Sequence, residues 1–298
     1  MTITVNGNEF DMDTAGASLG EVLASADDIL ERAGSVILGL RLDGTEIGAD
    51  DLPGLRDKPA SECRLLEIDS APASELRGRA YGSLLEFLGI LREWSAGTGP
   101  SKPLREAWET YGRTYSGLLS SDEHSFLDLL GRDLESADSG GEERRRLARH
   151  ADSLEPIFRE RLEELRDPAA ALRSASRLYE AERQNLMDVS VRLQTGKDAQ
   201  AMRSILLFVE IFNKANRILP ELARIGMDTS SLRIDGKSIP EFYESFNAIL
   251  RQLMEAFEAK DAVLIGDLAE YEIVPRMNAF FETMRSEEHT SELQSRGL

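Results

Sequence analysis

Residues 2–10 read TITVNGNEF, and this stretch decides the fold of the first part of the chain. Ile3 and Val5 alternate with polar residues, which is the period of a half-buried β-strand. Asn6-Gly7 follows directly, and this pair favours the positive backbone angles of a two-residue hairpin turn. The stretch therefore predicts two antiparallel strands at the start of the chain.

An amphipathic helix is predicted after the hairpin. Ser18 and Glu21 have the spacing of a capping box, and Gly34 supplies the stop signal. The apolar residues between them recur at helical spacing, as one buried side of a helix requires. They are Leu19, Val22, Leu23, Ala26, Ile29 and Leu30.

Three more strands are predicted beyond this helix. Residues 36–42 form the first, Asp43-Gly44 turns the chain into a short strand that ends at Ile47, and residues 63–68 form the last. The predicted order is therefore strand, strand, helix, strand, short strand, strand.

This order resembles the β-grasp or ubiquitin-like fold over residues 1–70, and the opening MTITVNG looks like the start of the sulfur carriers of thiamine biosynthesis. Sulfur carriers and ubiquitin-like modifiers work through a free C-terminal Gly-Gly. Here the domain ends in EIDSAPASEL and runs on into more chain. The resemblance therefore implies a docking or regulatory module, not carrier chemistry.

The predicted fold class is α+β, with a small N-terminal β-grasp domain followed by an all-α multi-helix region that ends in an antiparallel four-helix bundle. The small, proline-containing stretch DSAPAS (69–74) is predicted to be the boundary after residues 1–70. A helical middle region is expected over residues 75–166, interrupted at SADSGG (136–141). The bundle is expected over residues 167–284.

The middle region is expected to begin with a helix from about Glu75 to Trp94. Ser101 with Pro103 opens a second helix and Ser121 caps a third, before a charge-rich helix that ends at Asp167. The apolar positions at helical spacing in the second and third helices are Trp108, Tyr111, Tyr115, Phe126, Leu129 and Leu130.

Four helices are predicted from Asp167-Pro168, which is a cap followed by a proline at the first helical position. Short turns at QTGKD (194–198) and Lys260-Asp261, with a longer link at residues 227–237, indicate an up-down-up-down order. Pro275 predicts a kink. The expected apolar positions include Leu172, Leu178, Leu186, Val189, Leu193, Met202, Ile205, Leu206, Val209, Phe212, Leu219, Ile249, Leu250, Leu253, Leu264, Leu268, Tyr271 and Val274.

The charge of the chain limits its partners. The 54 acidic residues outnumber 35 basic ones, so the formal net charge is -19. Such a surface repels phosphate backbones and anionic lipid, and neither nucleic acid nor a membrane is expected as a partner. The densest basic run, EERRRLARH (142–150), is predicted to be a solvated helix face.

Cysteine usage and the absence of targeting signals favour a cytoplasmic location. Cys63 is the only cysteine, which excludes an intrachain disulfide, and it is predicted to be a core residue. The N-terminus lacks the basic start and apolar run of a signal peptide, and no stretch approaches the roughly 18 apolar residues of a membrane-spanning helix.

No motif predicts a catalytic residue, a cofactor or a metal ligand. The Glu-x-x-His pairs of di-iron bundles are absent around His124 and His150. Asp267 and Glu270 lie one helical turn apart and could hold a divalent ion, but a solvated acidic face is favoured. The glycine-rich AGTGPSKP (96–103) lacks the G-K-[ST] ending of a phosphate loop, so an interhelical linker is favoured.

Aromatic residues of the predicted bundle suggest a mode of binding. They are expected to lie mostly in the core, with a minority lining a groove for an amphipathic partner helix. With RLYEAERQ (177–184) in its first helix, the bundle resembles flagellar export chaperones of the flagellin-binding type, and this resemblance implies an amphipathic client. The phenylalanines concerned are Phe208, Phe212, Phe242, Phe246 and Phe257.

The resulting prediction is a non-enzymatic, cytoplasmic adaptor, chaperone or assembly factor of bacterial type, which binds another protein and is linked to flagellar or secretion systems. The alternative is an enzyme with an unrecognised site in the helical region, which would require a deep pocket around Asp267, Glu270 or His150. A small-molecule sensor that uses the β-grasp surface is a third possibility. The oligomeric state stays open.

The final stretch, RSEEHTSELQSRGL (285–298), does not continue the helical pattern before it. Residues 285–295 look like the codon-for-codon translation of a common short-read sequencing adapter. The alternative is a frayed polar terminus. These residues are therefore expected to be a non-native tail, with a natural chain that continues differently after Met284, and His289 is excluded as a candidate ligand.

Overall fold

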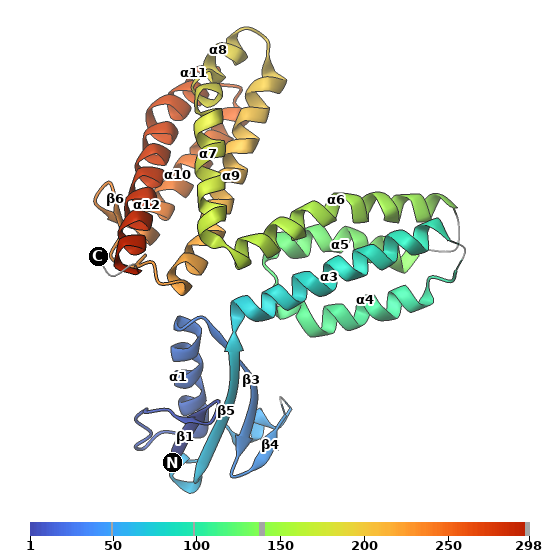
Figure 1. The fold of residues 1–298 in the computed structure, drawn as a ribbon, viewed down its shortest axis with the longest axis vertical. Helices are drawn as coiled ribbons and strands as arrows, with labels where there is room; N and C mark the ends of the chain where they lie inside the picture. Colours follow the sequence, from blue (N-terminus) through green and yellow to red (C-terminus); the bar gives the residue numbers. More distant parts are fainter. Residues whose placement is uncertain (49, 98, 137–140, 296–298) are drawn as a thin grey trace. The chain divides into compact units, whose positions relative to one another are not determined.

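The computed structural model describes residues 1–48, 50–97, 99–136 and 141–295, with the side chains of 136 and 288–295 left out. Two compact units, Met1–Leu162 and Glu163–Leu298, are each described by themselves. The predicted α+β class is confirmed, because a small N-terminal mixed sheet precedes a region of many helices (Figure 1). The interruption predicted at SADSGG centres on residues 137–140, outside the described residues.

All five predicted strands of the first unit are present. They are β1 (Thr2–Val5), β2 (Asn8–Glu9), β3 (Ser35–Leu42), β4 (Thr45–Ile47) and β5 (Leu65–Pro72). They form one sheet in the order β2-β1-β5-β3-β4, in which β1 and β5 are parallel and the other neighbours are antiparallel.

The turns of the sheet have the predicted backbone geometry. Asn6 and Gly7 have φ values of 50° and 79°, and Asp43 and Gly44 have φ values of 51° and 85°. The Asp43 carboxylate also accepts the backbone N–H groups of residues 64 and 65, each at 2.9 Å. The turn between β3 and β4 is therefore tied to the start of β5.

Helix α1 (Leu19–Arg32) packs on this sheet and begins at the predicted capping box. The Ser18 N–H donates to the Glu21 carboxylate at 2.8 Å, and the Glu21 N–H donates to the Ser18 hydroxyl at 3.3 Å. Ile29 is 41% exposed, contrary to its predicted place on the buried side. The buried core comprises Ile3, Leu19, Val22, Ala26, Leu30, Leu40, Leu42, Ala60, Cys63, Leu66 and Ile68.

Acid is expected to destabilise this sheet and helix through two carboxylates. Backbone N–H donors from Leu65 and Arg64 lower the pKa of Asp43, and the backbone and hydroxyl of Ser18 lower the pKa of Glu21. A carboxyl group with a lowered folded-state pKa stabilises the fold above its unfolded pKa of about 4, and this stability is lost as pH falls through the folded value.

The urea midpoint of unfolding, followed by circular dichroism, should therefore fall as the pH is lowered from about 5 to about 2.5. The Asp43→Asn variant should show a weaker pH dependence, because its amide cannot titrate. An identical dependence in the variant would contradict the role given to this carboxylate.

The stretch DSAPAS contains the change from sheet to helix, but it is not a separate linker, because β5 runs directly into helix α3 (Ala73–Ala96). The pairing of β5 with β3 continues to Pro72, and the Ala73 N–H donates to the Gly34 carbonyl at 2.8 Å. The pairing of β5 with β1 ends at Ile68, so the last residues of β5 form an edge. An edge tolerates proline, which explains a strand with linker-like composition.

After α3, the first unit continues with α4 (Lys102–Tyr115), α5 (Ser121–Ser136) and the start of α6 (Gly141–Arg166). The short helix α2 (Leu52–Leu55) lies between β4 and β5 along the chain. Ser120, not Ser121, is the cap of α5. Its N–H donates to the Glu123 carboxylate at 2.8 Å and its hydroxyl accepts the Glu123 N–H at 3.3 Å.

The buried side of α5 differs from the prediction. Phe126 and Leu129 are 41% and 49% exposed, whereas Leu127, Leu130 and Leu134 are buried. The buried positions repeat at intervals of three and four residues, as a helix requires. Of the three residues predicted to be buried on this helix, only Leu130 is buried. The other two were misplaced because the sequence carries apolar residues on both sides of the helix.

The predicted solvated face at residues 142–150 is wrong for Arg144, which is 5% exposed. Its guanidinium carbon lies 4.0 Å from the ring centre of Trp94. Its nitrogens donate to the Trp94 and Gly97 carbonyls at 2.8 Å and to the Gly99 carbonyl at 2.5 Å. Arg144 therefore binds the C-terminal end of α3 and the segment after it.

The second unit has four long helices, α7 (Pro168–Met187), α9 (Asp198–Arg224), α10 (Ile239–Glu258) and α12 (Val274–Ser295). A short helix adjoins each of the two predicted short turns: α8 (Val189–Gln194) precedes the first, and α11 (Ala262–Asp267) follows the second. α8 contacts α11, and α7 packs along α9 (Figure 1).

The connection over residues 227–237 contains a hairpin that was not predicted. Strands β6 (Arg233–Ile234) and β7 (Lys237–Ser238) pair around Asp235-Gly236, whose φ values are 50° and 77°. The Asp-Gly signal was present in the sequence, but the flanking strands are too short for a period-2 pattern.

The irregularity predicted at Pro275 takes the form of a π-helical segment, Leu268–Ile273, between α11 and α12. Proline has no N–H to donate to the carbonyl four residues earlier, so the regular ladder is interrupted there. The Tyr179 hydroxyl donates to the Val274 carbonyl at 3.1 Å just beyond this segment.

Five side chains predicted for the buried side of the second unit are exposed by 40% to 64%. They are Leu178, Met202, Leu206, Leu264 and Tyr271.

None of the helices in the described residues has the length and apolarity needed to cross a membrane.

Candidate functional site: a cleft between α7 and α12

A cavity of about 350 Å³ opens between α7 and α12. Its base is formed by Leu172, Phe281 and Met284, which are 3%, 0% and 0% exposed. Polar and charged side chains complete the lining. They are Arg173, Ser176, Arg177 and Glu180 of α7 and Arg285 of α12.

Helical spacing places the α7 residues of the cleft together. Positions 172, 173, 176, 177 and 180 recur at intervals of three and four residues along one face. The helix starts where the Asp167 carboxylate accepts the Ala170 N–H at 2.8 Å. Tyr179 fixes α7 against α12, because its ring stacks on Phe281 at a centroid distance of 5.3 Å.

The walls of the cleft carry more positive than negative charge. Three arginines and one glutamate line it, in a chain whose net charge is -19. Arg285 lies 3.3 Å from the Glu180 carboxylate, whereas Arg177 forms no ion pair with any of the described residues. Arginine stems also present carbon surface, so these walls combine apolar stems with cationic heads.

A second cavity, of about 410 Å³, lies between α4 and α5. Trp108 and Tyr111 line it with a ring-centre distance of 5.6 Å, and burial raises the pKa of Tyr111. The charged residues along its α5 wall are of both signs, so they do not favour one class of ligand. They are His124, Asp128, Arg132 and Glu135.

The histidine considered for an enzymatic site lies beside a carboxylate between α5 and α6. His150 Nδ1 and Arg146 Nε each lie 3.0 Å from Oδ2 of Asp133. His150 lines neither of the two cavities. This arrangement joins two helices.

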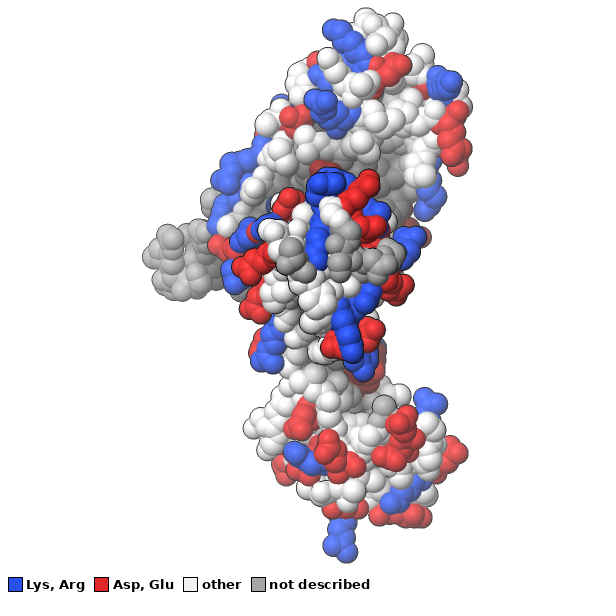
Figure 2. Space-filling view, turned by 90° about the vertical axis from the view of Figure 1, so that its right-hand side faces the viewer, with Lys and Arg blue, Asp and Glu red and all other residues white. Residues whose placement is uncertain are grey.

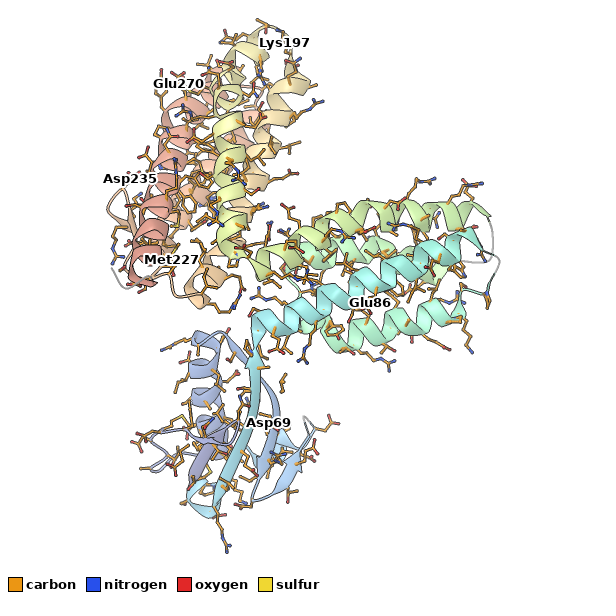
Figure 3. All side chains as sticks on the ribbon, in the orientation of Figure 1. Asp69, Glu86, Lys197, Met227, Asp235 and Glu270 are labelled. Carbon is orange, nitrogen blue, oxygen red and sulfur yellow. The ribbon has the colours of Figure 1, made fainter. Side chains whose placement is uncertain are left out.

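Asp267 and Glu270 are both exposed, and Figure 3 places Glu270 on the outer side of the helices. Neither residue lines either cavity. Within the part of the chain that the structure describes, no three metal-binding side chains gather at one place.

The phenylalanines considered for a partner groove lie in the core. Phe208, Phe212, Phe242 and Phe246 are at most 4% exposed, and Phe257 packs partly buried against them. The rings of Phe212 and Phe246 stack with centres 4.3 Å apart. These residues do not line a groove, and the cleft lies elsewhere on the same unit.

Sequence reasoning missed the cleft, although one signal was present. Arg173 and Arg177 are four residues apart on a predicted helix, next to Leu172 at an apolar position. This spacing predicts one shared helix face. The contribution of α12 could not be predicted, because it depends on how α7 and α12 pack. Glu180 and Arg285, which pair across these helices, are 105 residues apart in sequence.

Two separate parts of the chain match known family models. Residues 1–71 match the model described as "TP0873 N-terminal domain", and residues 171–283 match the one described as "Domain of unknown function (DUF8042)". The second match contains the cleft residues from Leu172 to Phe281.

A curated relative is similar to part of the chain. It is described as "Uncharacterized protein" of Treponema pallidum (strain Nichols) and is 29% identical over 109 residues, which are 37% of this chain and 54% of that protein. The chain therefore matches about half the length of this relative. No solved structure matches the chain.

Proposed function

We propose that this protein is a non-enzymatic, cytoplasmic adaptor, a chaperone or assembly factor of bacterial type that binds another protein through its C-terminal helices. The observation that carries this proposal is the α7–α12 cleft, whose cationic walls stand over a buried apolar base. Among the described residues, the lining holds no histidine beside Ser176, so a hydrolytic site is not favoured there.

A second module supports the adaptor proposal. Residues 1–72 fit a β-grasp docking module, because one helix packs on a mixed sheet of order β2-β1-β5-β3-β4. Since β5 continues into α3, this module has no free end for carrier chemistry. Fifteen acidic and five basic residues give it an acidic surface, part of which is visible in Figure 2. That charge favours a basic partner surface.

The alternative of an enzyme in the helical region has less support. His150, Asp267 and Glu270, on which it would depend, line neither of the cavities. A link to flagellar or secretion systems rests on the resemblance of the bundle alone.

Affinity capture of the tagged full chain from its native host, followed by quantitative mass spectrometry, tests the proposal. We expect one or a few proteins at near-stoichiometric amounts, and cross-links from them to α7 or α12. Recovery of no protein partner under mild, low-salt conditions would contradict the adaptor function. An activity found in the purified chain and lost on substitution of His150 or Asp267 would support the enzyme instead.

A further inference from the structure

We propose that the α7–α12 cleft binds an acidic, amphipathic helical segment of the partner. This inference rests on the proposed protein-binding function and adds the chemistry of the occupant. Charge is the first argument for it. Without Arg285, the lining still carries Arg173 and Arg177 against Glu180, although the chain as a whole carries a charge of -19.

The spacing of the arginines favours a helical occupant. Arg173 and Arg177 are one turn apart on α7, which separates their Cβ atoms by about 5–6 Å. Carboxylates at positions i and i+4 of a second helix have the same separation. Arginine binds a carboxylate through two parallel N–H donors, so each such pair would fix the orientation of the bound helix in addition to attracting its charge.

The size of the cleft favours one or two side chains over a whole cofactor. Its volume of about 350 Å³ lies at the lower end of the range for ligand pockets. An apolar side chain between the two carboxylates would lie against the arginine stems, above the buried Leu172 and Phe281. An amphipathic helix supplies this combination of side chains.

The acidic surface of the rest of the chain argues against longer polyanions. A nucleic acid or an anionic membrane extends well past one cleft, and the net charge of -19 would repel it. A short acidic segment contacts the cleft and little else. The argument depends on Arg173 and Arg177, because Arg285 falls within the residues that resemble a translated adapter.

A pair of labelled peptides tests the inference on the full chain. One is an amphipathic peptide of about 18 residues with leucine at helical spacing and glutamate on both flanks, and the other has lysine in place of glutamate. By fluorescence anisotropy at low salt, we expect at least about tenfold tighter binding of the acidic peptide, equivalent to about 1.4 kcal/mol. Its affinity should fall as salt is raised, because salt screens exposed charges.

Two charge reversals supply the matched comparison. Arg177→Glu should weaken binding of the acidic peptide by about tenfold or more. Arg203→Glu makes the same charge change at an exposed residue of α9 that does not line the cleft, and should leave binding unchanged. Hydrogen exchange should slow in α7 and α12 when the acidic peptide is bound. Arg177→Ala serves as a milder variant if the reversal disturbs folding.

Equal binding of the two peptides, binding of neither, or equal effects of the two reversals would overturn the inference. Binding of anionic phospholipid vesicles in preference to the acidic peptide, with loss in Arg177→Glu, would also overturn it and assign the cleft to a lipid surface. If capture recovers a partner that Arg177→Glu still binds, the inference fails while the adaptor function stands. If capture recovers no partner, the adaptor function itself fails.

Discussion

Replacing Arg144 with alanine is expected to lower the free energy of unfolding of the first unit by about 3 kcal/mol. The guanidinium donates to three carbonyls, those of Trp94, Gly97 and Gly99, and lies over the Trp94 ring. Alanine removes all of these contacts and leaves the carbonyls at the end of α3 without this donor. Both the desolvated groups and the lost cation–π contact contribute to the cost.

Tryptophan fluorescence in urea measures this effect, because both tryptophans, Trp94 and Trp108, belong to the first unit. Arg145→Ala is the matched control, since Arg145 is the exposed neighbour on the same helix and should change stability by less than about 0.5 kcal/mol. Equal losses in the two variants would contradict the role assigned to Arg144. Arg144→Lys should be almost as unstable as Arg144→Ala, because lysine lacks the planar guanidinium whose nitrogens reach the three carbonyls.

Replacing Gly266 with alanine is expected to destabilise the second unit by about 2–3 kcal/mol. A Cβ atom at this position would lie 2.3 Å from Cβ of Ser190 and 3.3 Å from its Cα. Because one of the atoms that the new Cβ would meet belongs to the backbone of Ser190, the clash cannot be relieved by a side-chain rotation alone, and the short helices α8 and α11 would have to separate. Loss of their packing would loosen the end of the bundle where both short turns meet.

A double-mutant cycle with Ser190→Gly tests this contact, since it removes the side chain that the new methyl group would meet. The cost of Gly266→Ala should be much smaller in the Ser190→Gly background, with a coupling of about 1 kcal/mol or more. Far-UV circular dichroism and hydrogen exchange of the second unit provide the readout. Gly89→Ala is a control, because a Cβ at position 89 of α3 would meet nothing within 4 Å. An additive cycle would refute the steric account.

Much of the fold could be predicted because its signals are local. Asn6-Gly7 and Asp43-Gly44 determine turns through their own backbone preferences, and Ser18 with Glu21 fixes the start of α1 within four residues. Such features depend little on distant parts of the chain. The succession of strands and helix along the first unit, and the positions of the long helices, could therefore be inferred from single stretches of sequence.

The errors concern properties that depend on packing between distant segments. DSAPAS has the composition of a linker, yet residues up to Pro72 form a strand because β3 lies beside them. Arg144 sits in a charge-rich helix that looks solvated, and its burial depends on the loop after α3. In both cases a tertiary partner overrides the local preference.

Only the α7 side of the candidate site could be predicted from the sequence. The arginine spacing on α7 is visible in the sequence, whereas Phe281 and Met284 reach the cleft through the packing of α12 on α7. The phenylalanine pattern instead suggested a groove, but helical periodicity cannot separate a core stripe from a binding stripe. Burial in the folded unit makes that distinction.

The central claim is that this protein holds a partner through the α7–α12 cleft. The most direct test is isothermal titration calorimetry of the captured partner with the wild-type full chain and with the Arg177→Glu and Arg203→Glu variants. Binding through this cleft predicts that Arg177→Glu raises the dissociation constant about tenfold or more, while Arg203→Glu leaves it unchanged. Identical dissociation constants for all three proteins would contradict it.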